Sequence, residues 1–294
     1  MPKPNCSPVR STDLAECWTV LKLLRWTADY FAGRGLDAPR LDAELLLAAT
    51  LGLDRVGLYV NFERPLQADE LAAYRERVRR RAGREPLAYI LGQAEFWSLP
   101  LKVTPEVLIP RPETELLVEE ALPRLTGRQQ VLDVGTGSGA LAIALAHERQ
   151  ELLVTAIDVS PAALAVAADN ARSNGVAERI RFAQHDLGQL PPGPFDLIVA
   201  NPPYVPSGEL ATLMPEVRDF EPQLALDGGV DGLDAYRALA RQAEVVLTAS
   251  GWLLVEVGSG QAPAVQELFA GAGLKEILSA RDLAGIERVV GGRR

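Results

Sequence analysis

The tetrapeptide Asn201-Pro202-Pro203-Tyr204 directly follows an apolar run over 195–200 whose composition predicts a buried strand. Ligands of open α/β sheets bind at the carboxyl ends of strands, so we expect this loop to face a ligand crevice. An amide or aromatic amino nitrogen is a weak nucleophile because its lone pair is delocalised. The Asn201 oxygen and the Pro202 carbonyl can accept both hydrogens of such a nitrogen, and Pro202 and Pro203 make the loop rigid. Tyr204 adds a flat face for a planar group.

These features favour a substrate site over a simple proline-rich turn. Candidate catalytic residues are Asn201, Pro202 and Tyr204, and candidate substrate-binding residues are these three with Pro203.

A glycine-rich turn predicts the other half of the site. Val131–Val134 is a candidate strand, and a helix over 140–146 is expected after the turn. The turn consists of Gly135, Thr136, Gly137, Ser138 and Gly139. Without Cβ atoms the backbone can pass close to a ligand. The spacing is GxGxG after an acidic residue, which differs from the GxGxxG of dinucleotide-binding domains.

Two aspartates end the next two predicted strands. A carboxylate at Asp158 can accept both ribose hydroxyls of an adenosine, and Asp186 can bond the adenine amino group. Each alone is equally well explained as a helix N-cap. Together with the glycine turn and Asn201, they predict a site for a methyl donor with an adenosine part. Transfer from a sulfonium can be in line, and it needs neither a metal nor a covalent intermediate.

No metal site is expected, because potential ligands are few. His147 and His185 are the only histidines, and we assign no catalytic role to either. Cys6 and Cys17 lack CxxC spacing, so both are expected to be reduced thiols of a cytoplasmic protein. No apolar run approaches the roughly 18 residues of a membrane span, and no signal-peptide pattern is present at the N-terminus.

The elements that position these residues fall into three segments. Residues 1–85 are predicted to form a small helical bundle, with helices ending near Gly33, opening at Pro39 and running over 68–82. Residues 86–103 are predicted to form a β-hairpin linker, with strands near 89–92 and 96–99. From 104 to 294, strands alternate with helices, which predicts a doubly wound α/β sheet. The further strand candidates are 152–157, 180–183, 195–200 and 252–257, with a terminal hairpin from 276–279 and 288–291.

Charge is divided unevenly between these segments. Residues 1–92 hold 14 Lys/Arg and 12 Asp/Glu, for a net charge of +2, and residues 93–294 hold 16 and 27, for a net charge of −11. An acidic domain is a poor partner for a phosphate backbone, so direct nucleic-acid binding is not expected.

The chain resembles the protein-(glutamine-N5) methyltransferases that modify peptide release factors, over nearly its whole length. Besides the glycine turn and the Asn-Pro-Pro-Tyr loop, the resemblance rests on Glu95–Leu101, on Leu-Ile-Pro-Arg-Pro-Glu-Thr-Glu at 108–115, and on Phe220-Glu221-Pro222. A sister family that methylates a ribosomal-protein glutamine departs from this pattern at the segment beginning with Arg111. The Asn-Pro-Pro-Tyr tetrapeptide is also found in adenine and guanine amino-methyltransferases, so it does not determine the substrate by itself.

The resemblance implies a Rossmann-like, seven-stranded class I methyltransferase domain that uses S-adenosyl-L-methionine. The implied substrate is the glutamine of the Gly-Gly-Gln motif in class I peptide chain release factors, with a role in translation termination. Residues 135–139, Asp158, Asp186, Leu187 and Asn201 carry over to the cofactor, and Asn201–Tyr204 carry over to the glutamine. The family often has an aromatic residue where this chain has Leu187. We expect a monomeric, cytoplasmic enzyme.

A basic stretch permits two interpretations. Six arginines lie between 75 and 84, and they form either a solvated helix face or a dock for an acidic release-factor surface. The alternative functions are a ribosomal-protein glutamine methyltransferase, a nucleic-acid amino-methyltransferase, and, outside the methyltransferases, a nucleotide-binding oxidoreductase or an adenosine-sensing module.

Overall fold

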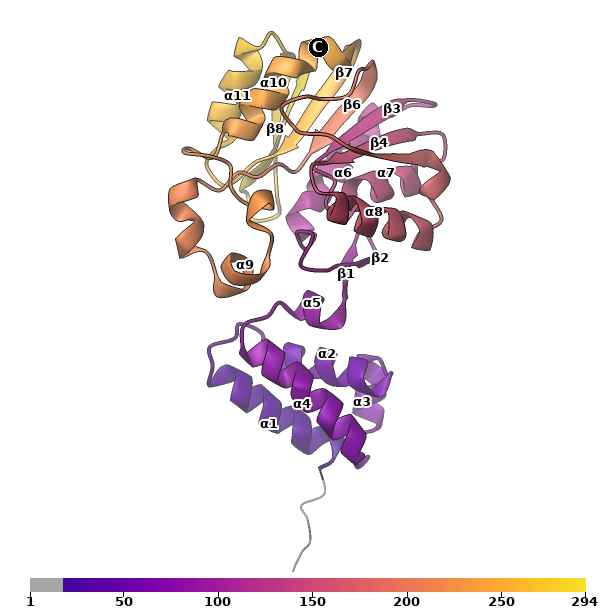
Figure 1. Ribbon diagram of the computed structural model, residues 1–294, viewed down its shortest axis with the longest axis vertical. Coiled ribbons are helices and arrows are strands. Elements are labelled where there is room, and N and C mark those ends of the chain that lie inside the picture. Colours follow the sequence, from indigo (N-terminus) through magenta and orange to yellow (C-terminus); the bar gives the residue numbers. More distant parts are fainter. Residues whose placement is uncertain (1–17) are drawn as a thin grey trace, which may run out of the picture. The chain divides into compact units, whose positions relative to one another are not determined.

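The computed structural model of the chain describes residues 18–294, which fold into two compact units that meet in the sequence between Leu91 and Gly92 (Figure 1). Both cysteines lie outside the described residues, as does Leu14, which the helical spacing of apolar residues predicts to belong to the first helix. No helix among residues 18–294 is long and apolar enough to cross a membrane.

The first unit is the predicted helical bundle. Its helices are α1 (Val20–Ala32), α2 (Pro39–Leu51), α3 (Arg55–Val60), α4 (Ala68–Ala82) and α5 (Leu87–Leu91). Thr19 caps α1 by accepting the amide of Lys22, and the side chains of Gln67 and Glu70 form a capping box at α4. The apolar faces close over one core that includes Phe31, Leu46 and Tyr74.

A buried ion pair crosses this bundle. The Arg81 Nε donates to Asp42 Oδ2 at 2.6 Å, and both side chains are at most 10% exposed. The predicted solvated face is therefore wrong for Arg81, which points inward from the last turn of α4. Arg80 instead pairs with Glu85, and Arg79 pairs with Glu76 on the surface at 2.5 Å. The basic stretch is thus partly structural, because these arginines point in different directions around the helix.

Reversing Arg81 to Glu is expected to destabilise the bundle by about 3–5 kcal/mol, since it removes one partner of a buried pair and brings two carboxylates together. Native-state hydrogen exchange of the α1–α4 amides would measure this loss. Arg79→Glu is the matched control on the exposed side of the same helix turn, where the change should be much smaller. Equal protection in the two variants would show that the buried pair does not stabilise the unit.

The second unit opens with a short hairpin. β1 (Gln93–Phe96) and β2 (Leu99–Lys102) pair antiparallel around Trp97 and Ser98, whose φ angles of 54° and 58° make a tight turn. The hairpin is confirmed, but the predicted strands at 89–92 and 96–99 are wrong, because residues 89–91 lie in α5 and Trp97 and Ser98 form the turn. Pro86 is suited to a helix start, and its carbonyl accepts the amides of both Tyr89 and Ile90 at 3.1 Å.

The seven-stranded sheet predicted from the sequence is confirmed, with strand order β5-β4-β3-β6-β7-β9-β8. β3 to β7 run parallel, and β9 is antiparallel to both β7 and β8. The strands are β3 (Gln130–Val134), β4 (Leu153–Asp158), β5 (Ile180–Gln184), β6 (Phe195–Ala200), β7 (Leu247–Glu256), β8 (Lys275–Arg281) and β9 (Glu287–Arg293).

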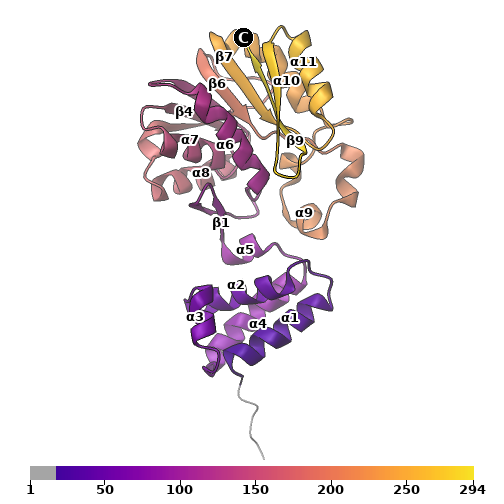
Figure 2. The ribbon, with the colours of Figure 1, turned by 180° about the vertical axis from the view of Figure 1, so that it is seen from behind.

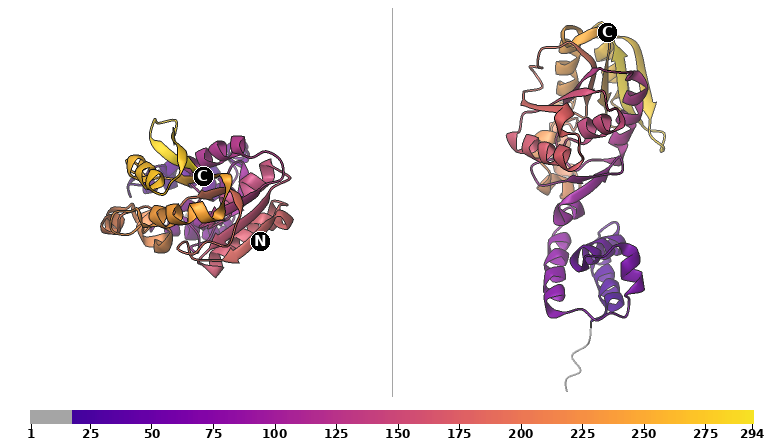
Figure 3. Two further views of the ribbon diagram at one scale, coloured as in Figure 1. Left: turned by 90° about the horizontal axis from the view of Figure 1, so that it is seen from above. Right: turned by 90° about the vertical axis from the view of Figure 1, so that its right-hand side faces the viewer.

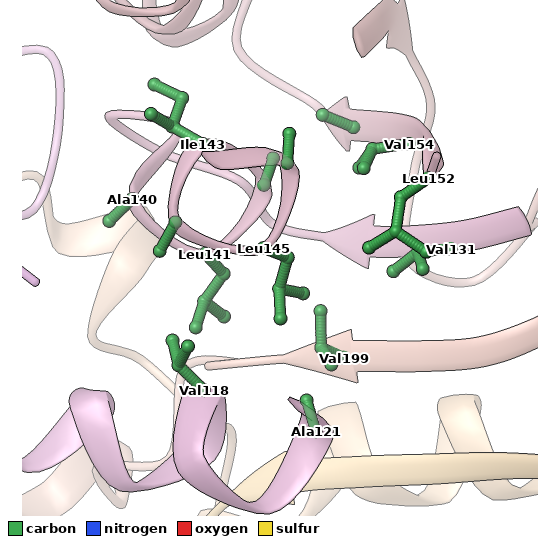
Figure 4. Packing of buried hydrophobic residues seen from close by; sticks show 14 of the residues in the cluster. Val118, Ala121, Val131, Ala140, Leu141, Ile143, Leu145, Leu152, Val154 and Val199 are labelled. Carbon is green, nitrogen blue, oxygen red and sulfur yellow. The ribbon is translucent and has the colours of Figure 1, made fainter. Parts of the chain in front are cut away.

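Helices cover both faces of this sheet (Figure 2 and Figure 3). α6 (Glu115–Ala121), α7 (Ala140–Glu148) and α8 (Pro161–Ser173) contribute to one core, and α10 (Asp234–Val246) and α11 (Ala262–Gly271) to the other. Alternate strand residues serve the two cores, as Val199 faces α6 and α7 while Ile198 faces the opposite layer (Figure 4). The short α9 (Pro215–Phe220) and the 3-10 turns at Pro112–Thr114, Leu122–Arg124, Ala177–Arg179, Ser207–Thr212 and Gln223–Ala225 complete the unit.

Candidate active site

The strand register brings the predicted site residues to one edge of the sheet. Val134 at the end of β3 pairs with Ile157 on one side and Ala200 on the other, and Ala200 pairs with Val255. The residues that follow these four positions therefore emerge side by side. Three of these residues, Gly135, Asp158 and Asn201, line a cavity of about 840 Å³ inside the second unit, whereas the fourth, Glu256, is buried and does not line it. This is the carboxyl edge, where ligands of such sheets bind.

The glycine turn is pinned to the neighbouring strand. The amides of Gly135 and Thr136 both donate to the Ile157 carbonyl at 2.9 Å. Gly139 has a φ of +85°, and a Cβ there would lie 2.9 Å from Ile143 and 3.1 Å from the Cβ of Ala167. A side chain at this position would therefore separate α7 from α8. Gly135 has open space where a Cβ would lie, so this backbone is accessible to a ligand.

A buried acid holds the turn from beneath. Asp133 is fully buried, and its Oδ2 accepts the Thr136 hydroxyl at 2.6 Å and the Ala142 amide at 3.2 Å. Burial raises the pKa of Asp133 to about 7, and the two hydrogen bonds only partly oppose this shift. An acid before the glycine turn is visible in the sequence, but its role, which is to fix the turn and the start of α7, is evident only from these contacts.

Asn170 of α8 is a further support that the sequence analysis missed. Its amide nitrogen donates to the carbonyls of Ser138 and Lys102, at 2.8 and 3.0 Å, and its oxygen accepts the Lys102 amide at 2.7 Å. The glycine turn is thereby connected to the β1–β2 hairpin. The side chain is 1% exposed, so no solvent could replace these bonds.

Asp158 is located where β4 ends, beside the glycine turn. Its Oδ2 accepts the Gly137 amide and its Oδ1 accepts the Ser160 amide, both at 2.9 Å. Ser160 caps α8 itself by accepting the Ala163 amide, so Asp158 is not the N-cap. Each carboxylate oxygen has a second lone pair. Asp158 can therefore organise the turn and still accept hydroxyl groups from the cavity, which it lines.

The loop after β5 forms another wall of the cavity. Asp186 and Leu187 line it, and Asp186 Oδ1 accepts the Gly188 amide at 2.6 Å. Gln242 of α10 holds the loop by donating to the Leu187 carbonyl at 2.9 Å and accepting the Leu190 amide at 2.7 Å. Leu187 packs against the α10-side core, so it offers the cavity an apolar surface in place of a ring.

The Asn-Pro-Pro-Tyr loop is held by close backbone contacts. Gln261 donates to the Tyr204 carbonyl at 2.9 Å, and a Cβ at Gly232 would lie 2.4 Å from that same oxygen. A Cβ at Gly228 would lie 2.8 Å from the Tyr204 Cα. Burial, with a smaller contribution from Glu256, raises the pKa of Tyr204 to about 12, so the phenol is neutral at physiological pH.

The Asn201 amide is oriented by a hydrogen-bonded chain of buried groups. Its Nδ2 donates to the Thr114 hydroxyl at 3.0 Å, and that hydroxyl donates to Glu256 Oε2 at 2.5 Å. Thr114 and Glu256 are 4% and 3% exposed. The sequence analysis quoted Thr114 within a motif but gave neither residue a role. An acid at the end of a predicted buried strand was the available signal for Glu256.

A second ion pair joins two segments near the cavity. Glu221 accepts from Arg111 Nη2 at 2.5 Å and from the Ile109 amide at 3.2 Å. Leu108 and Pro222, which flank these contacts in the sequence, both line the cavity. The two quoted motifs around Arg111 and Glu221 are therefore bonded to each other in space.

Most of the predicted site residues meet in this cavity. Its lining includes Gly135, Gly137, Asp158, Asp186, Leu187, Asn201 and Pro203. Thr136 and Ser138 are buried behind it, and Gly139 serves helix packing. Pro202 and Tyr204 belong to the same loop but do not contribute to the lining. Within residues 18–294, no group of three or more His, Cys, Asp or Glu residues could hold a metal ion.

Comparison with known proteins agrees with this geometry. Residues 22–92 match the family described as PrmC N-terminal domain, and residues 112–216 match the methyltransferase small domain. The release factor glutamine methyltransferase of Geobacter sulfurreducens is 50% identical over 283 residues, which cover 96% of this chain and 99% of that protein. The one of Rhodopirellula baltica is 41% identical, over 93% and 95% of the two chains.

The chain belongs to the release factor glutamine methyltransferase family. It is thus an S-adenosylmethionine-dependent methyltransferase, and the oxidoreductase alternative is wrong. A methyltransferase from Pyrococcus furiosus shares the fold, with a TM-score of 0.51 and 18% identity over 66% of this chain and 88% of that one.

Asp158 provides a test of cofactor binding in this family member. Asp158→Ala is expected to weaken S-adenosylmethionine binding by about 1.5–3 kcal/mol, the usual range for hydrogen bonds to a charged group. Isothermal calorimetry measures the change. Asp219→Ala, which removes an exposed carboxylate paired only with its neighbour Arg218, is the control. Unchanged affinity in a folded Asp158→Ala protein would restrict the carboxylate to organising the turn.

Proposed function

We propose that this protein transfers a methyl group from S-adenosyl-L-methionine to the side-chain amide nitrogen of the glutamine in the Gly-Gly-Gln motif of class I peptide chain release factors. The observation that supports this most directly is the Asn201 amide, which is held beside the glycine turn with its nitrogen engaged by Thr114. This leaves its oxygen as an acceptor. The names of the full-length relatives support the release factor as substrate.

The cavity suits the proposed cofactor. The exposed glycine backbone, the Asp158 carboxylate and the apolar Leu187 line one continuous space, as an amino acid, a ribose and an adenine would require. S-adenosylmethionine supplies an electrophilic methyl group on a sulfonium. We place its adenosine against Asp158, Asp186 and Leu187, and its methionine part near residues 135–139 and Asn201.

The proposed mechanism orients a weak nucleophile. The Asn201 oxygen and the Pro202 carbonyl accept the two hydrogens of the glutamine NH2, and Pro203 confines its plane from the cavity wall. Tyr204, which packs against the α10-side core, supports the loop that carries these groups. The nitrogen lone pair then points along the line of the departing sulfur. The nitrogen–carbon bond would form as the carbon–sulfur bond breaks, S-adenosylhomocysteine would leave with the bonding electron pair, and the nitrogen would lose one proton to solvent water. No residue needs to form a covalent intermediate.

One comparative assay tests the substrate. The protein is incubated with methyl-labelled S-adenosylmethionine and, separately, with a class I release factor, a release factor whose Gly-Gly-Gln glutamine is replaced by Ala, ribosomal protein and RNA. Label is expected only in the release factor that keeps the glutamine of its Gly-Gly-Gln motif. Label in the ribosomal protein or in RNA instead would favour the corresponding alternative function and contradict the proposal.

Asn201 is the residue on which the proposed mechanism depends most. Asn201→Ala removes an acceptor, so glutamine binds in unproductive orientations, and a displacement of about 1 Å costs on the order of 10²-fold in rate. Cofactor affinity should change much less, because Gly137 and Asp158 are untouched. Asn201→Asp keeps an acceptor oxygen and should retain some activity. Single-turnover methylation and cofactor titration of each variant provide the measurement.

Asn174→Ala, at the end of α8 in the same unit, is the matched control and should methylate normally. Near-normal transfer by the Asn201→Ala protein would show that Asn201 does not orient the nucleophile, and the mechanism would then be abandoned.

We further propose that the helical unit docks the release factor. A hollow of about 460 Å³ in this unit is lined by Trp18, Trp26 and Tyr30 and has Arg75 and Arg79 beside them. Both arginines are exposed, unlike the inward-facing Arg81. Aromatic and arginine side chains together are typical of protein-binding surfaces. The positive charge would attract an acidic partner surface.

Reversing Arg75 and Arg79 to Glu together should slow association with the release factor several-fold at low salt, because exposed charges act mainly on encounter. Surface plasmon resonance at low and high salt measures the rate. A double reversal of the exposed Arg181 and Arg241 in the other unit changes net charge equally and controls for it. Equal association rates for the two double variants would contradict docking at this hollow.

A further inference from the structure

A chain of three polar groups links the sheet interior to the substrate loop. β7 ends at Glu256 beside Asn201, because Val255 pairs with Ala200 in the register. Thr114 lies between the two side chains. It donates to Glu256 at 2.5 Å and accepts from Asn201 at 3.0 Å. Thr114 and Glu256 are almost fully buried, so they have no alternative partners in water.

The direction of each hydrogen bond follows from the chemistry of Glu256. An ionised carboxylate can only accept, whereas a threonine hydroxyl has one hydrogen and can also accept. The single hydrogen of Thr114 must then go to Glu256. Asn201 can approach Thr114 only with its NH2 group, which turns its oxygen away from Thr114. A side-chain amide could otherwise adopt either of two orientations related by a half-turn.

We propose that Glu256, acting through Thr114, is the positioning residue that keeps the Asn201 amide in the orientation whose oxygen accepts from the substrate nitrogen. This inference rests on the proposed function, since it concerns the group that would orient the glutamine. Glu256 does not touch the substrate in this scheme. It acts only by fixing which end of the Asn201 amide is presented.

The surroundings of Glu256 make its protonation state adjustable near neutral pH. Burial raises the pKa of Glu256 to about 7, and the nearby Glu113 adds to this shift. The Thr114 hydrogen bond and the positive charges of Arg288 and Arg111 oppose it. Two further titratable groups lie close by: Tyr204, and Tyr236, whose hydroxyl donates to the Glu256 backbone carbonyl at 3.0 Å. Burial raises the pKa of both phenols, so they stay neutral.

Protonation of Glu256 is expected to lower the rate of methyl transfer. Below about pH 7 Glu256 gains a proton and can itself donate to Thr114. The Thr114 hydrogen is then free to bond the Asn201 oxygen, which requires the amide to turn and present its NH2 group to the cavity. The NH2 groups of Asn201 and of the substrate glutamine, both hydrogen-bond donors, then face each other. The glutamine nitrogen is therefore no longer oriented for transfer. Methyl transfer is therefore expected to fall as pH falls through 7 and to level off above pH 8.

The test compares wild type with Glu256→Gln in single-turnover methylation of a release factor at saturating S-adenosylmethionine, from pH 6 to 9. A glutamine keeps the shape but can both donate and accept, so it no longer enforces one direction. At pH 8.5 the variant should be about tenfold slower, the factor produced by about 1.4 kcal/mol of barrier. At pH 6 the two rates should converge, and the variant should show no inflection near pH 7.

Thr114 provides the matched pair of variants. Thr114→Val keeps the shape without the hydroxyl and should lose both turnover and the inflection. Thr114→Ser keeps the hydroxyl and should restore most of both. S-adenosylmethionine affinity should be unchanged in all of these variants, which separates positioning from misfolding. A Thr114→Ser protein as impaired as Thr114→Val would reduce the role of Thr114 to packing and overturn the proposal.

Asp133 must be separated from Glu256, because burial raises the pKa of both carboxyls to about 7. Asp133→Asn should leave the inflection in the transfer rate in place. If Asp133→Asn removes it and Glu256→Gln does not, the proposal is wrong. Carbon NMR of protein labelled only at glutamate carboxyls gives a readout that does not depend on the substrate. One carboxyl should titrate near pH 7 in wild type and be missing in Glu256→Gln.

Failure of the proposed function and failure of the positioning role of Glu256 would give different results. A wild-type protein that leaves the release factor unlabelled contradicts the proposed function, whatever the NMR titration shows. A wild-type protein that methylates it, with a Glu256→Gln rate and pH profile equal to its own, overturns the positioning role alone.

Discussion

The register of the parallel strands β3, β4, β6 and β7 aligns their carboxyl ends along one edge of the sheet. The candidate site depends on this alignment. Val134, Ile157, Ala200 and Val255 are neighbours across the strands. The loops that follow them must share one narrow edge, where backbone groups no longer have ladder partners. The protein satisfies these groups with side chains, so the edge becomes a continuous hydrogen-bonded surface around the cavity.

Two buried carboxyls occupy equivalent places in this surface. Asp133 accepts the Thr136 hydroxyl at 2.6 Å, and Glu256 accepts the Thr114 hydroxyl at 2.5 Å. Each acid lies at or next to the end of its strand, and burial raises the pKa of each to about 7. Burying such groups is unfavourable for stability. Each acid instead fixes the direction of one threonine hydroxyl. Asp133 orients Thr136 in the glycine turn, and Glu256 orients Thr114, which contacts the Asn-Pro-Pro-Tyr loop.

The sequence predicted the parts of the fold that depend on local pattern. The strands of the seven-stranded sheet, the glycine turn and the helix that follows it can be predicted from local sequence pattern, and the structure confirms them. The groups that hold the site could not be predicted this way. Asn170 lies 68 residues from its partner Lys102, and Gln261 lies 57 residues from Tyr204. Polar residues on a helix or at its N-cap are usually solvated, so nothing local marks Asn170 or Gln261 as a hydrogen-bond donor to a distant backbone carbonyl.

The motif at residues 111–115 is more specific to one protein architecture than the Asn-Pro-Pro-Tyr tetrapeptide that it contacts. Arg111 bonds Glu221, Thr114 bonds both Asn201 and Glu256, and Glu115 accepts the Trp97 amide from the hairpin at 2.7 Å. Five residues therefore connect the hairpin, the wall of the cavity and the substrate loop. A tetrapeptide that orients an amide can occur in enzymes with different substrates, because its only structural requirement is a position directly after a strand. A connector that is bonded to four other residues constrains all of them at once. Its sequence therefore distinguishes one architecture around the loop, including how the Asn201 amide is turned, and the proposed orientation of the glutamine nitrogen depends on this property.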